Sequence, residues 1–367
     1  MLTKVLVYGY CLGVFSSRKI QQRLAEDVAF RVLAAGNQPD FRTIADFRKT
    51  HLTALRGFFE QVLQLARELG APRVGRVAID GSKIQANASK YKAMSYGRMR
   101  EKQRQLRDGV KQLLDQAEAA DAAEDAEYGP DRRGDELPAE LQRRESRLKR
   151  IREAKRALEA RAKAEAVVAG EADESVKPDS KAQYNFTDPE SRIMKGPDGF
   201  VQAYNVQLAV DELQLIVGHA VTQETNDKKQ LMPMIRTIAQ QSGDTPSQLL
   251  ADAGYCSDEN LIAIADTTID AHISARKQKH GERPGPCPRG PLPKTATRVD
   301  WMSRKLLTKA GAKVYAARKV IVEPVIGQTK QARGFRPFLL RGFEKVQGEW
   351  SLVCTTHNIL KLYRLCL

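Results

Sequence analysis

The hydrophobic pattern changes its period along the chain, and each change predicts a different kind of element. Over residues 1–72, apolar residues recur at helical spacing, as in Leu55, Phe58, Phe59 and Val62. This spacing is typical of amphipathic helices. Residues 74–86 are instead apolar and β-branched, which predicts a strand. The chain therefore begins with a helical region that leads into a sheet.

Beyond residue 97 the apolar positions narrow to two thin stripes in sequence rich in Ala, Glu, Lys, Arg and Leu. One stripe runs from Leu106 to Leu114 and the other from Leu141 to Leu158, with an acidic, turn-prone segment, Ala119 to Glu140, between them. Narrow stripes on two charged helices predict a helical hairpin that protrudes from its host domain. The pattern fits both a solvated charged spacer and a binding element.

After the hairpin, alternation of apolar and polar residues predicts three strands, over residues 191–195, 203–210 and 215–222. Asn226-Asp227 is typical of a helix N-cap and precedes an apolar helical pattern that begins at Leu231. A strand before Asp252, a helix at 257–266 and a strand at 269–274 follow. Helical patterning then resumes near Trp301 and continues past Glu323.

This order of elements predicts a mixed α/β sheet whose first strand is separated from the others by an insertion. We expect five segments: an N-terminal helical domain, the first part of the core, the hairpin, the remainder of the core and a C-terminal helix, at residues 1–72, 73–97, 98–180, 181–340 and 341–367. The apolar run from Val5 to Phe15 is too short to cross a bilayer and predicts a buried helix.

The charge balance indicates a polyanionic partner. The chain has a formal net charge of +15, which most often accompanies nucleic-acid binding. Its five cysteines are widely spaced without a C-x-x-C pair, so neither a disulfide framework nor a zinc site is expected, and the pattern fits a reducing cytoplasm.

Three carboxylates stand where a metal site could form. Asp80 and Asp252 each end an apolar run, and Glu323 lies on a late helix among cations. Phosphoryl transfer on nucleic acid needs two divalent metal ions about 3.5–4 Å apart, and Mg²⁺ prefers carboxylate oxygens. Small residues follow both aspartates, as in Gly81 and Gly254, and would let a ligand approach the backbone closely.

Lysines and arginines accompany each of these acids and are the residue types that neutralise DNA phosphates. Residues singled out as DNA contacts are Lys83, Tyr315, Arg318, Lys319, Lys330, Arg333 and Arg336. Helical spacing places Tyr315, Lys319, Glu323 and Lys330 on one face, although Pro324 can disturb that phase. Arg276, Lys277 and Lys279 follow the second acid in a basic loop.

Six segments together resemble the DDE-type transposases of bacterial insertion sequences. They are Lys4–Tyr10 with Ser16–Ile20, Asp80–Ser89, Asn185–Met194, Gly199–Asn205, Leu250–Tyr255, and Val322–Lys330 with Arg333–Phe335. The resemblance covers nearly the whole chain. It implies an α/β fold with a ribonuclease-H-like mixed sheet core, an N-terminal helical transposase domain and an inserted helical hairpin.

The resemblance also implies a function. It assigns Asp80, Asp252 and Glu323 as catalytic and metal-binding acids that hold two Mg²⁺ ions, or Mn²⁺, for DNA cleavage and strand transfer at the element's terminal inverted repeats. The implied partner is DNA, bound by a homodimer in the bacterial cytoplasm at the nucleoid. In the family's third motif, either Arg318 or Lys319 fits the place of the arginine.

Two alternatives remain open at this point. A ribonuclease-H-like nuclease that cuts without joining would carry nearly the same residues. Relatives usually carry further residues before the position of Met1, so a truncated or decayed copy that only binds DNA is the other alternative. Glu344 and Glu349 lie downstream of Glu323 and are alternative third acids.

Overall fold

The computed structural model describes residues 1–71, 74–128, 139–168, 170, 176–196, 199–276 and 285–366, with the side chains of 117–128, 139–141 and 168 left out. The chain divides into two compact units. The first comprises residues 1–88 and 190–367, and the second comprises residues 89–189. Each unit is described by itself below.

Five helices open the first unit: α1 (Leu2–Cys11), α2 (Ser17–Glu26), α3 (Val28–Leu33), α4 (Phe41–Thr50) and α5 (Leu52–Glu68). The aspartates Asp27 and Asp40 accept backbone N–H bonds at the starts of α3 and α4, which satisfies donors that a helix start leaves free. The short apolar run is α1, and it buries Val5, Leu6 and Tyr10, as the sequence predicts.

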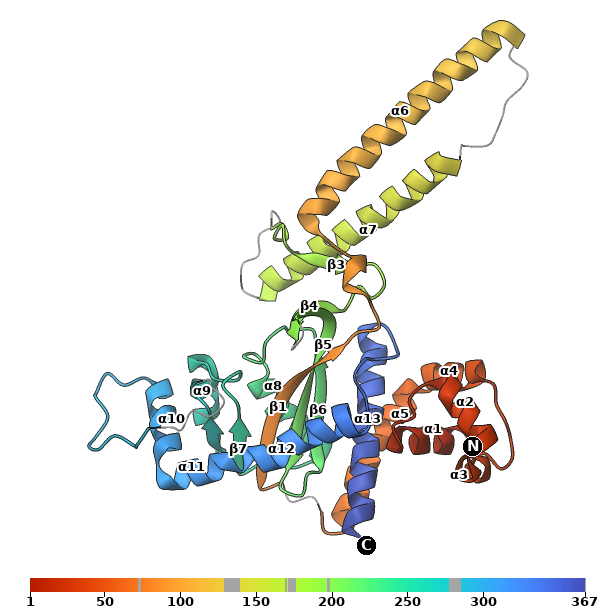
Figure 1. The fold of residues 1–367 in the computed structure, drawn as a ribbon. Helices are drawn as coiled ribbons and strands as arrows, with labels where there is room; N and C mark the ends of the chain where they lie inside the picture. The colour runs from red at the N-terminus through yellow and green to blue at the C-terminus, as the bar shows by residue number, and fades with distance from the viewer. Residues whose placement is uncertain are drawn as a thin grey trace. The chain divides into compact units, whose positions relative to one another are not determined.

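A six-stranded sheet forms the centre of this unit (Figure 1). Its strands are β1 (Arg76–Gln85), β4 (Arg192–Gly196), β5 (Gly199–Asp211), β6 (Ile216–Thr222), β7 (Gln248–Ala251) and β8 (Asp270–Ile273). The order is β4-β5-β1-β7-β8, with β6 also paired to β5. β5 is antiparallel to β1, whereas β7 and β8 run parallel to β1.

Alternation along the strands directs side chains to two separate cores. Ala78 of β1 packs in the core formed with α1, α5, α12 (Arg318–Gly327) and α13 (Phe343–Leu365). The neighbouring Val77 and Ile79 belong to the opposite core, with α8 (Leu231–Ser242) and α9 (Asp258–Ala265). This mixed sheet with helices on both faces confirms the predicted α/β, ribonuclease-H-like class.

The rest of the first unit is helical. The helices α10 (Arg298–Leu307) and α11 (Lys309–Ala316) precede α12, and the π-helical turn η2 (Gln328–Ala332) follows it directly. Among the described residues, no helix is long and apolar enough to cross a membrane.

The second unit is built on two long helices, α6 (Tyr96–Tyr128) and α7 (Ala139–Val168). At their base lie the 3₁₀ turn η1 (Lys90–Lys92) and a two-stranded sheet of β2 (Ala93–Ser95) and β3 (Gln183–Asn185). The predicted hairpin is thus present. Its helix α6 continues to Tyr128, into the segment predicted to be turn-prone, and residues 129–138 lie outside the described part.

Two details differ from the predictions. Helix α8 begins only at Leu231 with Gln230 as its N-cap, so Asn226-Asp227 is not the cap; the Asp227 side chain is bonded to β5 instead. The C-terminal helix, expected over residues 341–367, begins at Phe343. The predicted cations Lys277 and Lys279 lie outside the described residues.

Candidate active site

Two of the predicted acids lie side by side on neighbouring parallel strands. Asp252 directly follows β7, whereas Asp80 lies within β1, which continues to Gln85, and is therefore not at the strand end that its apolar run predicted. In the register of β1 and β7, Ile79 pairs with Ala251, so Asp80 and Asp252 are the next residues along each strand. Burial raises the pKa of Asp80 from 3.8 to about 7; the Arg318 guanidinium opposes this shift, and the negative charge of Asp252 adds to it. The middle of β1 and the end of β7 therefore hold two carboxylates close enough to repel each other.

Glu323 reaches this pair through an arginine. The Arg318 Nη1 atom lies 3.3 Å from Asp80 Oδ2 and 3.5 Å from Glu323 Oε1. One guanidinium thus bridges a strand acid and the acid of α12. Arg318 is the first residue of α12 and faces the acids. Lys319 is exposed, and the ion pairs of the described residues include none between Lys319 and these acids.

A fourth carboxylate, Asp227, lies in the same cluster, and the sequence analysis missed it. Its Oδ1 atom accepts hydrogen bonds of 2.7 Å from the side-chain amides of Asn205 and Gln207 on β5. The same oxygen lies 3.6 Å from Lys83 Nζ. The sequence did carry a signal for Asp227, because this acid follows a predicted strand as Asp252 does. Asp227 was instead interpreted as part of a helix N-cap.

Glycines make room for this carboxylate. A Cβ atom at Gly81 would lie 2.3 Å from Asp227 Oδ1, and one at Gly254 would lie 3.3 Å from Asp227 Oδ2. Real Cβ atoms do not approach an oxygen as closely as the first of these distances. A side chain at position 81 would therefore collide with Asp227, so the packing of this carboxylate requires glycine there. Access for a ligand would be a second reason for glycine.

A buried hydrogen-bond chain connects Asp227 to the segment that follows Asp252. The Tyr255 hydroxyl donates to Gln207 Oε1, and the Gln207 amide donates to Asn205 Oδ1 and to Asp227. Burial and the nearby carboxylates hold the pKa of Tyr255 well above its ordinary value, so the phenol remains a donor. The network fixes β1, β5 and the loop after β7 around the acids.

Two lysines complete the site on the β1 side. Lys330 Nζ, from η2, donates to Ser82 Oγ at 2.7 Å and to the Lys83 carbonyl at 2.9 Å. Burial lowers the pKa of both lysines; Asp227 opposes this for Lys83, whereas the Lys83 charge lowers the pKa of Lys330 further. Two cations are thus held close together beside Ser82.

The remaining predicted DNA contacts fall into different environments. Tyr315 is hydrogen-bonded to Arg318, and Arg336 is exposed and bonded to Gln331. Arg333 differs from the prediction: its guanidinium donates to Thr356 Oγ1 and to the Val353 carbonyl of α13. These hydrogen bonds hold the Arg333 side chain against α13, so we do not propose Arg333 as a DNA contact.

The alternative third acids lie in other settings. Glu349 is fully buried, and its Oε2 atom accepts the backbone N–H groups of Leu339 and Leu340 at 3.0 Å. Its Oε1 atom accepts the Tyr10 hydroxyl. Glu344 is exposed in the first turn of α13. Only Glu323, of these three glutamates, shares a cation with Asp80 among the described contacts.

Comparison with protein families identifies the family to which the chain belongs. The family described as "Transposase DDE domain" matches residues 176–359, which is half of the chain, and "Transposase domain (DUF772)" matches residues 1–50. The chain belongs to the DDE transposase family. No curated protein and no solved structure matches it.

The two matches cover different parts of the chain. The first 50 residues are helices α1 to α4, and the DDE match includes Asp252, Asp227 and Glu323. Asp80 lies outside the matched range, so its assignment rests on its position beside Asp252. The resemblance inferred from the sequence motifs is confirmed at the level of the family.

DDE transposases generally use divalent metal ions, and the donor chemistry here fits them. Asp80, Asp252 and Glu323 offer the carboxylate oxygens that Mg²⁺ prefers, and a positive charge, the Arg318 guanidinium, already lies between two of these acids. No group of three His, Cys, Asp or Glu residues among those described is close enough to hold an ion.

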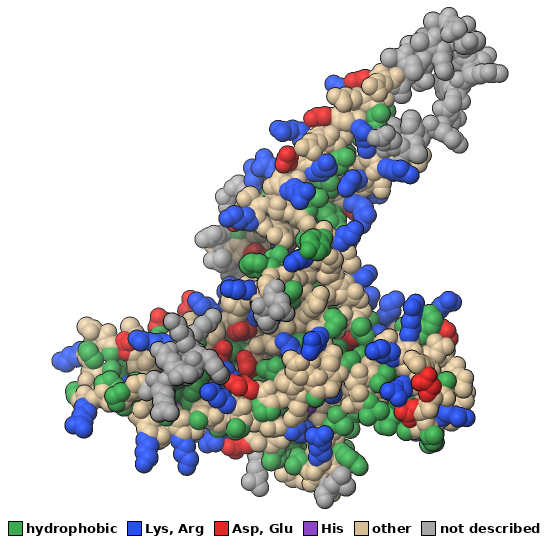
Figure 2. All heavy atoms as spheres, in the orientation of Figure 1, with side chains coloured by type: hydrophobic (Ala, Val, Ile, Leu, Met, Phe, Trp, Pro, Cys, Tyr) green, Lys and Arg blue, Asp and Glu red, His purple; other side chains and the backbone are tan. Residues whose placement is uncertain are grey.

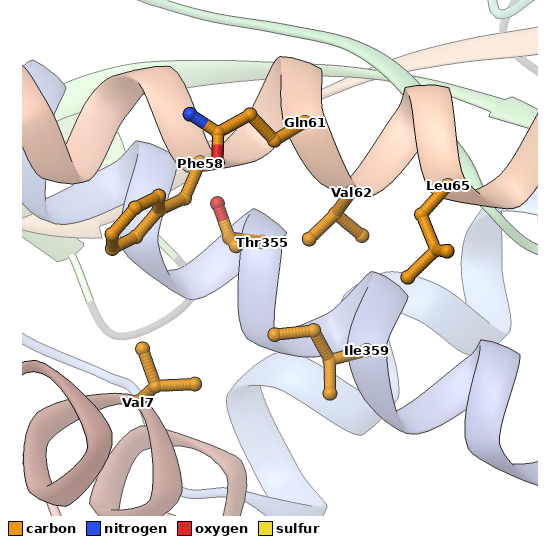
Figure 3. Close-up of a pocket in the computed structure, with 7 residues that line it drawn as sticks. All are labelled: Val7, Phe58, Gln61, Val62, Leu65, Thr355 and Ile359. Carbon is orange, nitrogen blue, oxygen red and sulfur yellow. The ribbon is translucent and has the colours of Figure 1, made fainter.

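An apolar groove of about 310 Å³ lies elsewhere in the first unit (Figure 3). Its walls come from α1, α5 and α13, with Val7, Phe58 and Ile359 pointing into it. None of its lining residues is a carboxylate or a cation, so it lacks the groups that phosphoryl transfer needs and is not the candidate active site.

Proposed function

We propose that this chain is a transposase that cleaves DNA at the ends of an insertion sequence and transfers the freed 3′ hydroxyl to target DNA. The observation that carries the proposal is the placement of three acids around one cation: Asp80 of β1 lies beside Asp252, which follows β7, and Arg318 contacts both Asp80 and Glu323. Membership of the DDE family supports the same chemistry.

In this proposal Asp80, Asp252 and Glu323 hold two Mg²⁺ ions, for which Mn²⁺ can substitute. When bound, such ions activate the attacking hydroxyl and stabilise the leaving oxygen. The two aspartates are fixed by strand pairing, whereas Glu323, half exposed on α12, is free to adjust. Asp227 already bonds two amides and a lysine, so its role is to position the site.

The cations of the site bind the DNA backbone in this proposal. Lys83 and Lys330 lie close together with no carboxylate bonded to Lys330 among the described contacts, and a phosphate would relieve their repulsion. Tyr315 is hydrogen-bonded to Arg318 and helps to position it. If Arg318 moves away from Asp80 and Glu323, its guanidinium can contact a DNA phosphate. Lys319 and Arg336 are exposed and are proposed as further phosphate contacts.

A nuclease that cuts without joining is the second candidate, because its site would need the same acids. The test incubates the protein with Mg²⁺, a duplex that ends in the element's terminal inverted repeat, and a supercoiled target plasmid. We expect cleaved ends and products in which the repeat is covalently joined to the plasmid. Cleavage without any joined product would establish the nuclease; DNA binding without cleavage would establish a copy that only binds DNA.

A further inference from the structure

The helical hairpin carries an exposed band of cations that none of the roles above uses. Figure 2 shows Lys and Arg side chains along both of its helices. The band consists of four residues on each helix. On α6 these are Arg100, Arg104, Arg107 and Lys111, and on α7 they are Lys149, Arg152, Arg156 and Lys163, all of them exposed.

The spacing within each set aligns its members. Residues three or four apart lie on one face of a helix, so each set forms a stripe parallel to the helix axis. At about 1.5 Å per residue, the α6 stripe is about 16 Å long and the α7 stripe about 21 Å. One strand of B-DNA presents a phosphate every 3.4 Å or so along its axis, and hence about five phosphates over the shorter stripe.

The packing of the hairpin places the two stripes on the same side. The seam between the helices buries Met99 and Leu106 of α6 against Ile151 and Leu158 of α7. Successive residues of a helix are rotated by about 100° around its axis. Arg100 and Arg107 each directly follow a seam residue of α6, and Arg152 directly follows a seam residue of α7, so both stripes are rotated away from the seam in the same direction around their own helix axes. When two helices run antiparallel and their seams face each other, equal rotations away from the seam place both stripes on the same side of the pair.

Contacts in the seam show which cations are used inside the hairpin and which are free. Arg144 donates to the Gly109 carbonyl at 3.2 Å, and Lys155 pairs with Glu159, which also accepts the Tyr96 hydroxyl at 2.7 Å. No described ion pair involves any of the eight band residues.

Cations outnumber carboxylates on this face. Six carboxylates lie three or four positions from members of the band, and these are Glu101, Asp108, Asp115, Glu145, Glu153 and Glu159. Met99, Leu106, Ile151 and Leu158 are buried in the seam, whereas Leu114 and Val167 are exposed near opposite ends of the hairpin and do not form a stripe. Long, flexible cations match a phosphate backbone, which is recognised by charge.

We propose that this face of the hairpin binds the phosphate backbone of duplex DNA, independently of base sequence. The proposal rests on the proposed function in that DNA is the substrate, and it adds a binding surface in a unit separate from the carboxylates. Each phosphate contact contributes about 0.9 to the slope of log K against log salt concentration, so the band has a measurable signature.

The test compares two triple variants of the full chain in duplex-DNA binding over a series of salt concentrations. The first is Arg100→Gln with Arg104→Gln and Arg107→Gln, which we expect to lower the magnitude of the salt slope by about 2–3 units. The matched control is Arg143→Gln with Arg147→Gln and Arg150→Gln; these residues are exposed on the opposite face of α7, so the slope should stay near that of the parent.

Replacing the same three α6 arginines by lysine keeps the charge and should keep the slope. Circular dichroism of each variant checks that the helices remain folded. A parental slope in the first glutamine variant would overturn the proposal, as would an equal loss in the control, because binding would then be diffuse. A parental slope combined with a changed oligomeric state would assign the band to a second copy of the chain instead.

Cleavage separates this inference from the proposed function. The control variant Arg143→Gln with Arg147→Gln and Arg150→Gln should cleave like the parent, because it retains all three acids and the band. If Asp80→Asn cleaves normally but the salt slope still falls in the α6 variant, the proposed function fails and the binding surface stands. If the slope is unchanged while Asp80→Asn is inactive, the surface fails alone.

Discussion

Replacing Asp80 by asparagine should stabilise the metal-free protein above neutral pH, and the gain should vanish in acid. The Asp80 side chain is only 16% exposed. Burial, with a further contribution from Asp252 and against the pull of Arg318, raises its pKa from 3.8 to about 7. The folded protein must therefore pay to ionise this carboxyl group, and an uncharged amide avoids that cost.

The size and sign follow from the proton linkage. A shift of about three pKa units at about 1.4 kcal/mol each gives a penalty of about 4 kcal/mol when Asp80 is fully ionised. Between about pH 4 and pH 7 the folded protein retains a proton that the unfolded chain has released, so its stability falls as pH rises. Above pH 7 the penalty is constant, and below pH 4 it is absent.

The assay is urea unfolding in EDTA at several pH values. The Asp80→Asn protein should exceed the parent by a few kcal/mol at pH 8 and should match it near pH 4. The exposed residue Asp46 supplies the control, since Asp46→Asn should change stability little at any pH. An Asp80→Asn gain that is equal at pH 4 and pH 8, or absent at pH 8, would refute the reasoning.

Three further predictions concern packing and organisation. Gly81→Ala should destabilise the protein by about 1–3 kcal/mol in urea unfolding, since the new Cβ would lie 2.3 Å from Asp227 Oδ1. Gly57 lies in an open position of α5 and supplies the control: Gly57→Ala should stabilise the protein by about 0.5–1 kcal/mol in the same assay. Arg48→Met should cost about 3–5 kcal/mol, because Arg48 donates to Tyr10 beside the buried Glu349 carboxylate; a Glu349→Gln change added to it should cost less than the sum of the single changes. Replacing residues 98–170 by a short Gly/Ser linker should leave a cooperative thermal transition, whereas loss of folding would make the hairpin part of the core.

The sequence predicted what local patterns determine. Strand periodicity placed Asp80 and Asp252 on strands, and parallel pairing of those strands brings the two acids together, although β1 continues past Asp80 to Gln85. The stripes of Leu106 and Leu148 likewise predicted the hairpin seam. These features depend on residues close in the chain and on one topological inference, so a single sequence is enough to suggest them.

What the sequence could not predict depends on contacts between distant segments. That Arg318 contacts Asp80 depends on the packing of α12 against β1, which no spacing rule gives. Asp227 joins the site because the amides of β5 hold it there. Arg333 differs from Arg336 only in packing: the first donates to α13 and the second is exposed.

The central claim is that three acids together perform metal-dependent cleavage of DNA. The most direct measurement is the cleavage rate on terminal-repeat DNA with Mg²⁺ for Asp80→Asn, Asp252→Asn and Glu323→Gln, with Glu344→Gln as the control. We predict that each of the three loses cleavage by several orders of magnitude while still binding DNA, and that the control cleaves like the parent. Parental cleavage by all three would contradict the account; parental cleavage by Glu323→Gln with an inactive Glu344→Gln would show that the third acid is misassigned.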